Sequence, residues 1–179
     1  INGDQSYRSI TYSVEGDWSG ASFLLVAGAI AAKKAKIRVD NLNYSGSLQA
    51  DKAIIDALKL CGADINLGDS FVEVSYGKLM GFNFDATDSP DLFPPLVCLA
   101  SFCEGISKIK GAVRLKHKES NRAETLYREF THLGANIELE DDLIRVEGLP
   151  SGIKGGEANS HNDHRIAMAC AVAGLLSTN

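Results

Sequence analysis

The sequence predicts an α/β fold built from a repeated unit in which a strand, a helix, a strand, a helix and two further strands follow one another. The first indication is an internal repeat, because the run at 60–74 is echoed at 132–146. Both runs are typical of a helix that ends at glycine and is followed by a β-hairpin. The second indication is that stretches of helical length alternate with short β-like runs along the chain. About two and a half strand-helix-strand-helix-strand-strand units fit into the 179 residues.

Each copy holds its elements in the same order. In the first copy the pattern predicts an apolar helix, a strand, an amphipathic helix and a hairpin, at residues 17–32, 37–39, 49–60 and 60–74. In the second copy the same elements are expected at residues 91–104, 106–109, 121–133 and 132–146. A third copy begins near residue 155 with a helix at 163–176. We therefore expect a single domain over residues 1–179, with units at 1–77 and 78–150 and an incomplete unit at 151–179.

The alternation of strands and helices is also typical of an ordinary doubly wound parallel sheet. The hairpin at the end of each copy favours the repeated unit instead, because a short turn can join only antiparallel strands.

Composition and charge limit the classes of function. Hydrophobic residues make up 45% of the chain and charged residues 23%, which is enough apolar material for a core. The formal net charge of −5 argues against nucleic acid or an anionic membrane as the main partner. No apolar run reaches membrane-spanning length and no signal peptide opens the chain, which begins with Ile1. We therefore expect a trimmed piece of a cytoplasmic protein.

The cysteines and histidines do not predict a metal site. The four cysteines lie on apolar segments without C-x-x-C spacing, so buried reduced thiols are expected. His161 and His164 are three residues apart, but a third ligand at a matching spacing is missing.

The basic run at 114–122 is the strongest signal for a ligand site. It holds four strong cations around the carboxylate of Glu119. If residues 114–118 are extended, three of these cations share one face, and a helix that starts near residue 120 points its free N–H groups into the same space. The run therefore predicts a phosphate or carboxylate site, although a solvated basic face is the commoner meaning of such a run.

A second polar cluster, at 160–165, stands directly before the apolar run at 166–176, which predicts a buried helix. A carboxylate also stands at the start of the apolar helix in all three copies, at Asp17, Asp91 and Asp163. Capping of the helix explains at least two of them. We expect Asp91 to be the exception, because Pro90 can set the turn while residues 88 and 89 serve the cap.

Four blocks of the sequence together carry a family resemblance. They are EGDWSGAS at 15–22, DSPD at 88–91, LKHKESNR at 115–122 and NDHRIAM at 162–168. In these blocks the chain closely resembles the 5-enolpyruvylshikimate-3-phosphate synthases, or 3-phosphoshikimate 1-carboxyvinyltransferases. The resemblance covers essentially all 179 residues. It implies most of the family's C-terminal domain, in which three such units pack their helices inside and their sheets outside, and it implies a separate N-terminal domain as partner.

The resemblance also implies roles for the residues that match the family's motifs. Asp91 would contact the shikimate ring and deprotonate its 5-hydroxyl. Lys118 and Glu119 would lie beside the reacting hydroxyl and the enolpyruvyl carbon and transfer protons. Arg122 and Arg165 would bind phosphoenolpyruvate, since a guanidinium can grip carboxylate or phosphate with two parallel hydrogen bonds.

Other positions are less closely tied to the family's motifs. Arg114 stands where some members have a substrate-binding asparagine, so its role stays open. His164 is expected to orient or cap. Glu15, Asp17 and Ser19 are expected to hold a domain interface or to cap a helix.

The implied reaction transfers the enolpyruvyl group of phosphoenolpyruvate to the 5-hydroxyl of shikimate 3-phosphate with release of phosphate, in chorismate biosynthesis. Neither a metal nor an organic cofactor is needed, and glyphosate is the inhibitor implied for the whole enzyme. One alternative is the enolpyruvyl transferase that acts on UDP-N-acetylglucosamine, although the element at 118–122 favours shikimate. Another is a non-catalytic anion-binding module of the same fold, against which the carboxylates among the cations argue.

Overall fold

The computed structural model describes residues 2–178. Its α-helices are α1 (Trp18–Ala31), α2 (Ile54–Leu60), α3 (Phe93–Ala100), α4 (Arg122–His132) and α5 (His164–Ala173). Short 3₁₀ helices lie at η1 (Ala50–Ala53), η2 (Pro90–Leu92), η3 (Ala112–Leu115) and η4 (Gly174–Leu176). The strands are β1 (Ile37–Asp40), β2 (Asp64–Leu67), β3 (Phe71–Ser75), β4 (Asn83–Asp85), β5 (Gly105–Lys110), β6 (Asn136–Glu140) and β7 (Leu143–Gly148).

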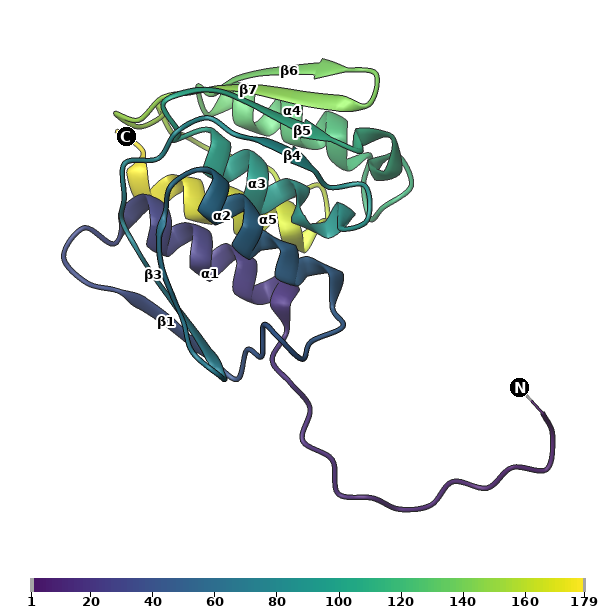
Figure 1. The fold of residues 1–179 in the computed structure, drawn as a ribbon. Coiled ribbons are helices and arrows are strands. Elements are labelled where there is room, and N and C mark those ends of the chain that lie inside the picture. Colours follow the sequence, from purple (N-terminus) through teal and green to yellow (C-terminus); the bar gives the residue numbers. More distant parts are fainter. Residues whose placement is uncertain (1, 179) are drawn as a thin grey trace.

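The strands form two sheets that lie on the outside of the molecule, with α1, α3 and α5 between them (Figure 1). One sheet has the order β1-β3-β2 and is antiparallel. The other has the order β4-β5-β7-β6, in which β4 runs parallel to β5 and the remaining pairs are antiparallel. Two separate sheets with closing hairpins rule out a doubly wound parallel sheet. The predicted repeated α/β fold, with helices inside and sheets outside, is confirmed.

Helices α1 and α3 are apolar on almost every side, and they are surrounded by protein. All eight residues of α3 are buried, and α1 buries ten of its fourteen. Both helices pack against α5 as well as against each other. In α1, a side chain at Gly28 would lie 3.0 Å from the Val74 carbonyl oxygen and 3.2 Å from Ile37 Cβ. Glycine therefore lets α1 approach β1 and β3 closely, and this fixes the distance between helix layer and sheet.

Residues 114–118 do not adopt the extended conformation on which a shared face of cations depended, and the cause lies at the tip of the β6–β7 hairpin. Gly111 adopts a φ of 105°, where a glycine is favoured, and β5 ends just before it. The backbone N–H groups of Gly111 and Ala112 donate to the Asp142 carbonyl oxygen, and the Val113 N–H donates to the Asp142 carboxylate. These bonds turn the chain into η3.

The prediction that the helix after residue 165 is buried is wrong for part of its surface. In α5, Ile166, Ala169 and Ala173 are buried, whereas Ala167 and Ala171 are exposed. The covered face is the one that packs against α1, α3 and α4.

The two copies also differ from each other at their first element. In the second copy β4 pairs with β5, whereas residues 2–17 contain no strand that pairs with β1 in the first copy. No helix within residues 2–178 is both long and apolar enough to cross a membrane.

Candidate functional site

The centre of the candidate site is a guanidinium group that is fully buried and surrounded by carboxylates. Arg122 is the first residue of α4 and has 0% exposed side-chain surface. Its Nε lies 2.9 Å from Asp163 Oδ2 and its Nη2 lies 3.3 Å from Asp163 Oδ1, which makes a two-pronged contact. A buried cation is costly unless it is paired in this way. Asp163 therefore holds the arginine in one orientation.

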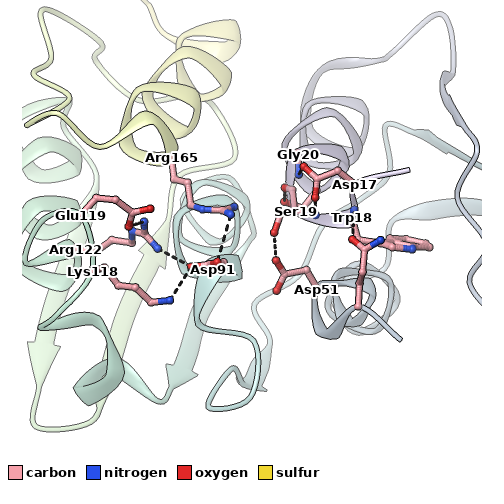
Figure 2. Close-up of polar contacts among 12 residues, drawn as sticks. Asp17, Trp18, Ser19, Gly20, Asp51, Asp91, Lys118, Glu119, Arg122 and Arg165 are labelled. Atoms are coloured by element: carbon pink, nitrogen blue, oxygen red, sulfur yellow. Dashed lines mark hydrogen bonds and ion pairs between the residues drawn. The ribbon is translucent and has the colours of Figure 1, made fainter. Parts of the chain in front are cut away.

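The remaining Arg122 donors point to the two carboxylates expected to take part in chemistry. Nη1 lies 2.8 Å from Asp91 Oδ1, and Nη2 lies 2.5 Å from Glu119 Oε2 (Figure 2). Glu119 precedes Arg122 by three residues, in the loop before α4, so a local turn is enough to bring the two together.

Asp91 collects three cations from three segments of the chain. Besides Arg122 it contacts Lys118 Nζ at 3.1 Å and Arg165 Nη2 at 3.3 Å (Figure 2). Partial burial alone would raise the pKa of Asp91, but the Lys118 hydrogen bond, the charge of Arg165 and the Arg122 hydrogen bond outweigh burial and lower it. In this arrangement Asp91 is therefore ionised and a weak base.

The cluster as a whole is close to neutral. Lys118, Arg122 and Arg165 carry three positive charges, and Asp91, Glu119 and Asp163 carry three negative ones. Each of the three cations is paired with a carboxylate of the same chain. An anionic ligand could take the place of such a carboxylate, because it offers the same kind of charged acceptor.

Arg165 has spare hydrogen-bonding capacity. Its Nε is buried and has no hydrogen-bond partner within residues 2–178, and its Nη2 makes one ion pair at 3.3 Å. A buried N–H group without a partner costs free energy. An anion that accepts a hydrogen bond from this Nε would therefore gain more binding free energy here than at a donor that is already paired.

A family model described as EPSP synthase (3-phosphoshikimate 1-carboxyvinyltransferase) matches residues 1–179. The chain belongs to the EPSP synthase family. It is 40% identical to the 3-phosphoshikimate 1-carboxyvinyltransferase of Brachyspira hyodysenteriae, with 100% of this chain and 42% of that protein aligned. It is 43% identical to the enzyme of that name from Clostridium acetobutylicum, with 98% and 39% aligned. The chain thus spans about 40% of the length of these relatives.

Solved structures agree with this membership. The EPSP synthase of Acinetobacter baumannii superimposes with a TM-score of 0.79 at 27% identity, over 93% of this chain and 41% of that one. The enolpyruvyl transferase NikO from Streptomyces tendae superimposes with a TM-score of 0.62 at 18% identity, over 92% and 37%, which supports the fold alone.

The structure brings together the five residues that the EPSP synthase resemblance singled out. Asp91 from η2, Lys118 and Glu119 from the loop before α4, Arg122 from α4 and Arg165 from α5 lie in one cluster (Figure 2). Their individual roles remain predictions.

Two cations of the basic run lie outside this cluster. Arg114 Nη1 donates to the Thr87 carbonyl oxygen at 2.8 Å, and Lys116 lines a hollow of about 720 Å³ beside α4 and β6. Arg114, Lys116 and Lys118 therefore do not share the face that an extended segment would have given them, because η3 and the turn that follows it replace the strand. The hollow's lining within residues 2–178 does not include the five clustered residues.

The helix-start carboxylates divide as predicted. Asp17 accepts hydrogen bonds from the N–H groups of Ser19 and Gly20, at 3.0 and 2.9 Å, and caps α1. Asp163 accepts from the Arg165 N–H at 3.0 Å and caps α5. The Asp91 oxygens bind cations instead. The expectation that Ser89 caps is wrong, since within residues 2–178 its side chain makes no cap bond.

Sequence reasoning missed the second role of Asp163, which both caps α5 and holds Arg122. Arg122 and Asp163 are 41 residues apart, so spacing carries no signal for their contact. Reasoning also missed Asp51, which binds Ser19 at the start of α1 and lies across from Asp91 (Figure 2). Burial raises the pKa of Asp51; the Ser19 hydrogen bond opposes this, and the charge of Asp91 adds to it.

Proposed function

We propose that this chain supplies the phosphoenolpyruvate-binding half of a 3-phosphoshikimate 1-carboxyvinyltransferase. The reaction would join the enolpyruvyl group of phosphoenolpyruvate to the 5-hydroxyl of shikimate 3-phosphate and release phosphate, in chorismate biosynthesis. The observation that carries the proposal is the convergence of three cations, Lys118, Arg122 and Arg165, on the carboxylate of Asp91. Membership of the EPSP synthase family supports the same reaction.

The arginines would bind the anionic groups of phosphoenolpyruvate. Arg165 has a buried Nε without a partner in the described chain, so its guanidinium can offer two parallel donors to a carboxylate or phosphate. Arg122 is held on its far side by Asp163, which leaves Nη1 and Nη2 directed at the carboxylates Asp91 and Glu119. A ligand anion would replace those carboxylates on the guanidinium groups.

That replacement would prepare Asp91 for proton transfer. While Asp91 is paired with three cations its pKa is low and it is a weak base. When a ligand anion takes over Arg122 and Arg165, Asp91 loses stabilising partners and gains a negative neighbour, and both changes raise its pKa. Asp91 could then remove the proton of the 5-hydroxyl as a general base.

The two carboxylates would divide the remaining proton transfers. Once a ligand anion has displaced Glu119 from Arg122, Glu119 would take a proton from solvent and donate it to the methylene carbon of phosphoenolpyruvate, while the hydroxyl oxygen bonds to the adjacent carbon. The Glu119 carboxylate would then take a proton back from the new methyl group, which restores the double bond. Phosphate would leave with the hydroxyl proton that Asp91 had accepted. Lys118 would stabilise negative charge that develops on oxygen during these steps. The scheme uses neither a metal nor an organic cofactor.

A second domain would complete the site. Asp91 keeps 31% of its side chain exposed and Glu119 keeps 45%, so the cluster faces outward from the described chain. The relatives are about 2.5 times as long as this chain. We place the additional wall on a further domain of the same enzyme, in the cytoplasm.

A phosphate-release assay tests the proposal. The protein that carries both domains should release phosphate from phosphoenolpyruvate only when shikimate 3-phosphate is present, and residues 1–179 alone should release none. If residues 1–179 alone show turnover, the site does not require a second domain. If the two-domain protein shows no turnover with shikimate 3-phosphate but does turn over UDP-N-acetylglucosamine, shikimate 3-phosphate is not its substrate.

A further inference from the structure

The geometry points to Glu129 as a positioning residue of this site. Glu129 holds the segment 159–162 against α4, and this segment delivers Asp163 to Arg122 and to the start of α5. The connection of this arrangement to phosphoenolpyruvate binding rests on the proposed function, whereas the positioning itself can be measured without it.

Both carboxylate oxygens of Glu129 bind the segment. Oε2 accepts a hydrogen bond from the Asn159 backbone N–H at 2.8 Å, and Oε1 lies 2.7 Å from His161 Nε2. Glu129 lies two helical turns after Arg122 on the same face of α4, and it is buried. A carboxylate in such a place requires partners, and the segment supplies them.

The segment has a backbone conformation that needs outside support. His161 and Asn162 have φ values of 52° and 58°, so two successive residues lie in the left-handed region. Residues other than glycine adopt this region at a cost, and they stay there when their surroundings hold them. Besides Glu129, the support comes from the Asn159 side chain, which accepts from the His161 N–H at 2.7 Å.

Asp163, the residue that follows this segment, binds Arg122 and the backbone of Arg165. Asp163 is fully buried, binds Arg122 through both oxygens and accepts from Ser120 Oγ at 3.1 Å. It also accepts from the Arg165 N–H and so fixes the start of α5. A shift of Asp163 would therefore move the Arg122 guanidinium and the first turn of α5 together.

Electrostatics keep Glu129 in the form that this role requires. Burial alone would raise the pKa of Glu129, but the Asn159 N–H, the His161 hydrogen bond and the nearby His161 and His132 lower it. On α5, burial raises the pKa of the Cys170 thiol to about 11, and the negative charge of Glu129 adds to this effect. Glu129 is therefore charged and Cys170 neutral in neutral solution.

The test uses residues 1–179 with two readouts, hydrogen exchange of the Arg165 backbone amide and calorimetric titration with inorganic phosphate. In Glu129→Ala the Arg165 amide should exchange at least about tenfold faster and phosphate affinity should fall at least about fivefold, because a buried acceptor is lost. Glu129→Gln keeps an acceptor for Asn159 and a donor for the imidazole. It should stay within about twofold of the parent chain in both readouts.

Two further variants guard against general unfolding. His161→Asn tolerates a left-handed φ but is too short to reach Glu129, so it should reproduce part of both effects. Glu138→Ala removes a carboxylate that pairs with Arg145 on the β6–β7 hairpin and should change neither. If Glu129→Ala and His161→Asn leave Arg165 exchange unchanged, the inference is overturned. Faster Arg165 exchange in a chain that binds no phosphate would support the positioning and contradict the proposed anion site.

Discussion

The starts of α1 and η2 occupy corresponding places in the two copies, yet their carboxylates have different partners. Asp17 gives both oxygens to backbone N–H groups at the start of α1. Asp91 gives its oxygens to Lys118, Arg122 and Arg165. The repeat therefore reproduces a backbone framework and leaves the chemistry to the side chains that surround each helix start.

The local sequence explains why the two carboxylates behave differently. After Asp17, the N–H groups of Ser19 and Gly20 have no carbonyl partner within the helix, so the Asp17 side chain can cap them. Before Asp91, Pro90 takes the first position of η2, where its missing N–H removes a donor and its fixed φ suits the turn. Asp91 then points toward the cations supplied by α4, α5 and the loop before α4.

The largest expected difference between the two helix starts is in turnover. In the two-domain enzyme, Asp91→Asn should lower kcat by about two orders of magnitude or more, the usual scale for loss of a general base, and it should weaken shikimate 3-phosphate binding much less. The measurement is steady-state phosphate release. Asp88→Asn, three residues earlier and exposed, serves as the matched control and should keep kcat within about twofold. Retention of turnover within about threefold in Asp91→Asn would remove Asp91 as the base.

The arginines should tolerate lysine poorly, because lysine keeps the charge and loses the planar fork. Arg122→Lys and Arg165→Lys should each raise the apparent Michaelis constant for phosphoenolpyruvate about tenfold, and that for shikimate 3-phosphate less. Arg128→Lys, on the exposed side of α4, is the control and should change both constants by less than about twofold. Equal effects on both substrates would place Arg122 and Arg165 at a domain interface.

Acid should weaken the fold in part through Asp163. Burial alone would raise the pKa of Asp163, but Arg122, the Arg165 N–H and Ser120 lower it. Between the lowered pKa and the ordinary value near 4 the unfolded chain binds more protons, so stability falls as pH falls through this window. Urea midpoints of residues 1–179 between pH 6 and pH 3 should therefore decrease, and Asp163→Asn should show a flatter decrease from a lower plateau. An exposed control, Asp69→Asn, should follow the parent curve, and equal slopes in Asp163→Asn and the parent would contradict the assignment.

The smallest expected effect belongs to the α1 cap. Asp17→Ala should lower the free energy of unfolding by about 0.5–2 kcal/mol, because two N–H groups lose their acceptor. Ser89→Ala, at the corresponding cap position of η2, should change it by less than about 0.5 kcal/mol. Both are measured by urea unfolding of residues 1–179. Equal losses in the two variants would show that the caps of the two copies are alike.

The sequence was sufficient where a signal is local. The glycine-ended helices and the hairpins follow from short-range patterns, and so do the caps at Asp17 and Asp163. Contacts between distant segments were not accessible in this way. The η3 turn depends on Asp142, which lies on another hairpin, and the exposed face of α5 depends on which helices pack against it.

The cluster itself was predicted through the family's motifs, whereas its charge balance was not. The motifs identified Asp91, Glu119 and the cations. The ion pair between Arg122 and Asp163 could not be predicted from them, because it requires α4 and α5 to pack together. Packing of this kind is set by the whole core and is invisible in any one segment.

The central claim is that Asp91 occupies the place of a ligand anion on the arginines. The most direct test is a calorimetric titration with phosphate, at one ionic strength, of residues 1–179 and of the same chain with Asp91→Asn. Asp91→Asn should bind phosphate at least about threefold more tightly than the parent chain, because Arg122 and Arg165 lose a competing charge. Unchanged or weaker phosphate binding by Asp91→Asn would contradict the account.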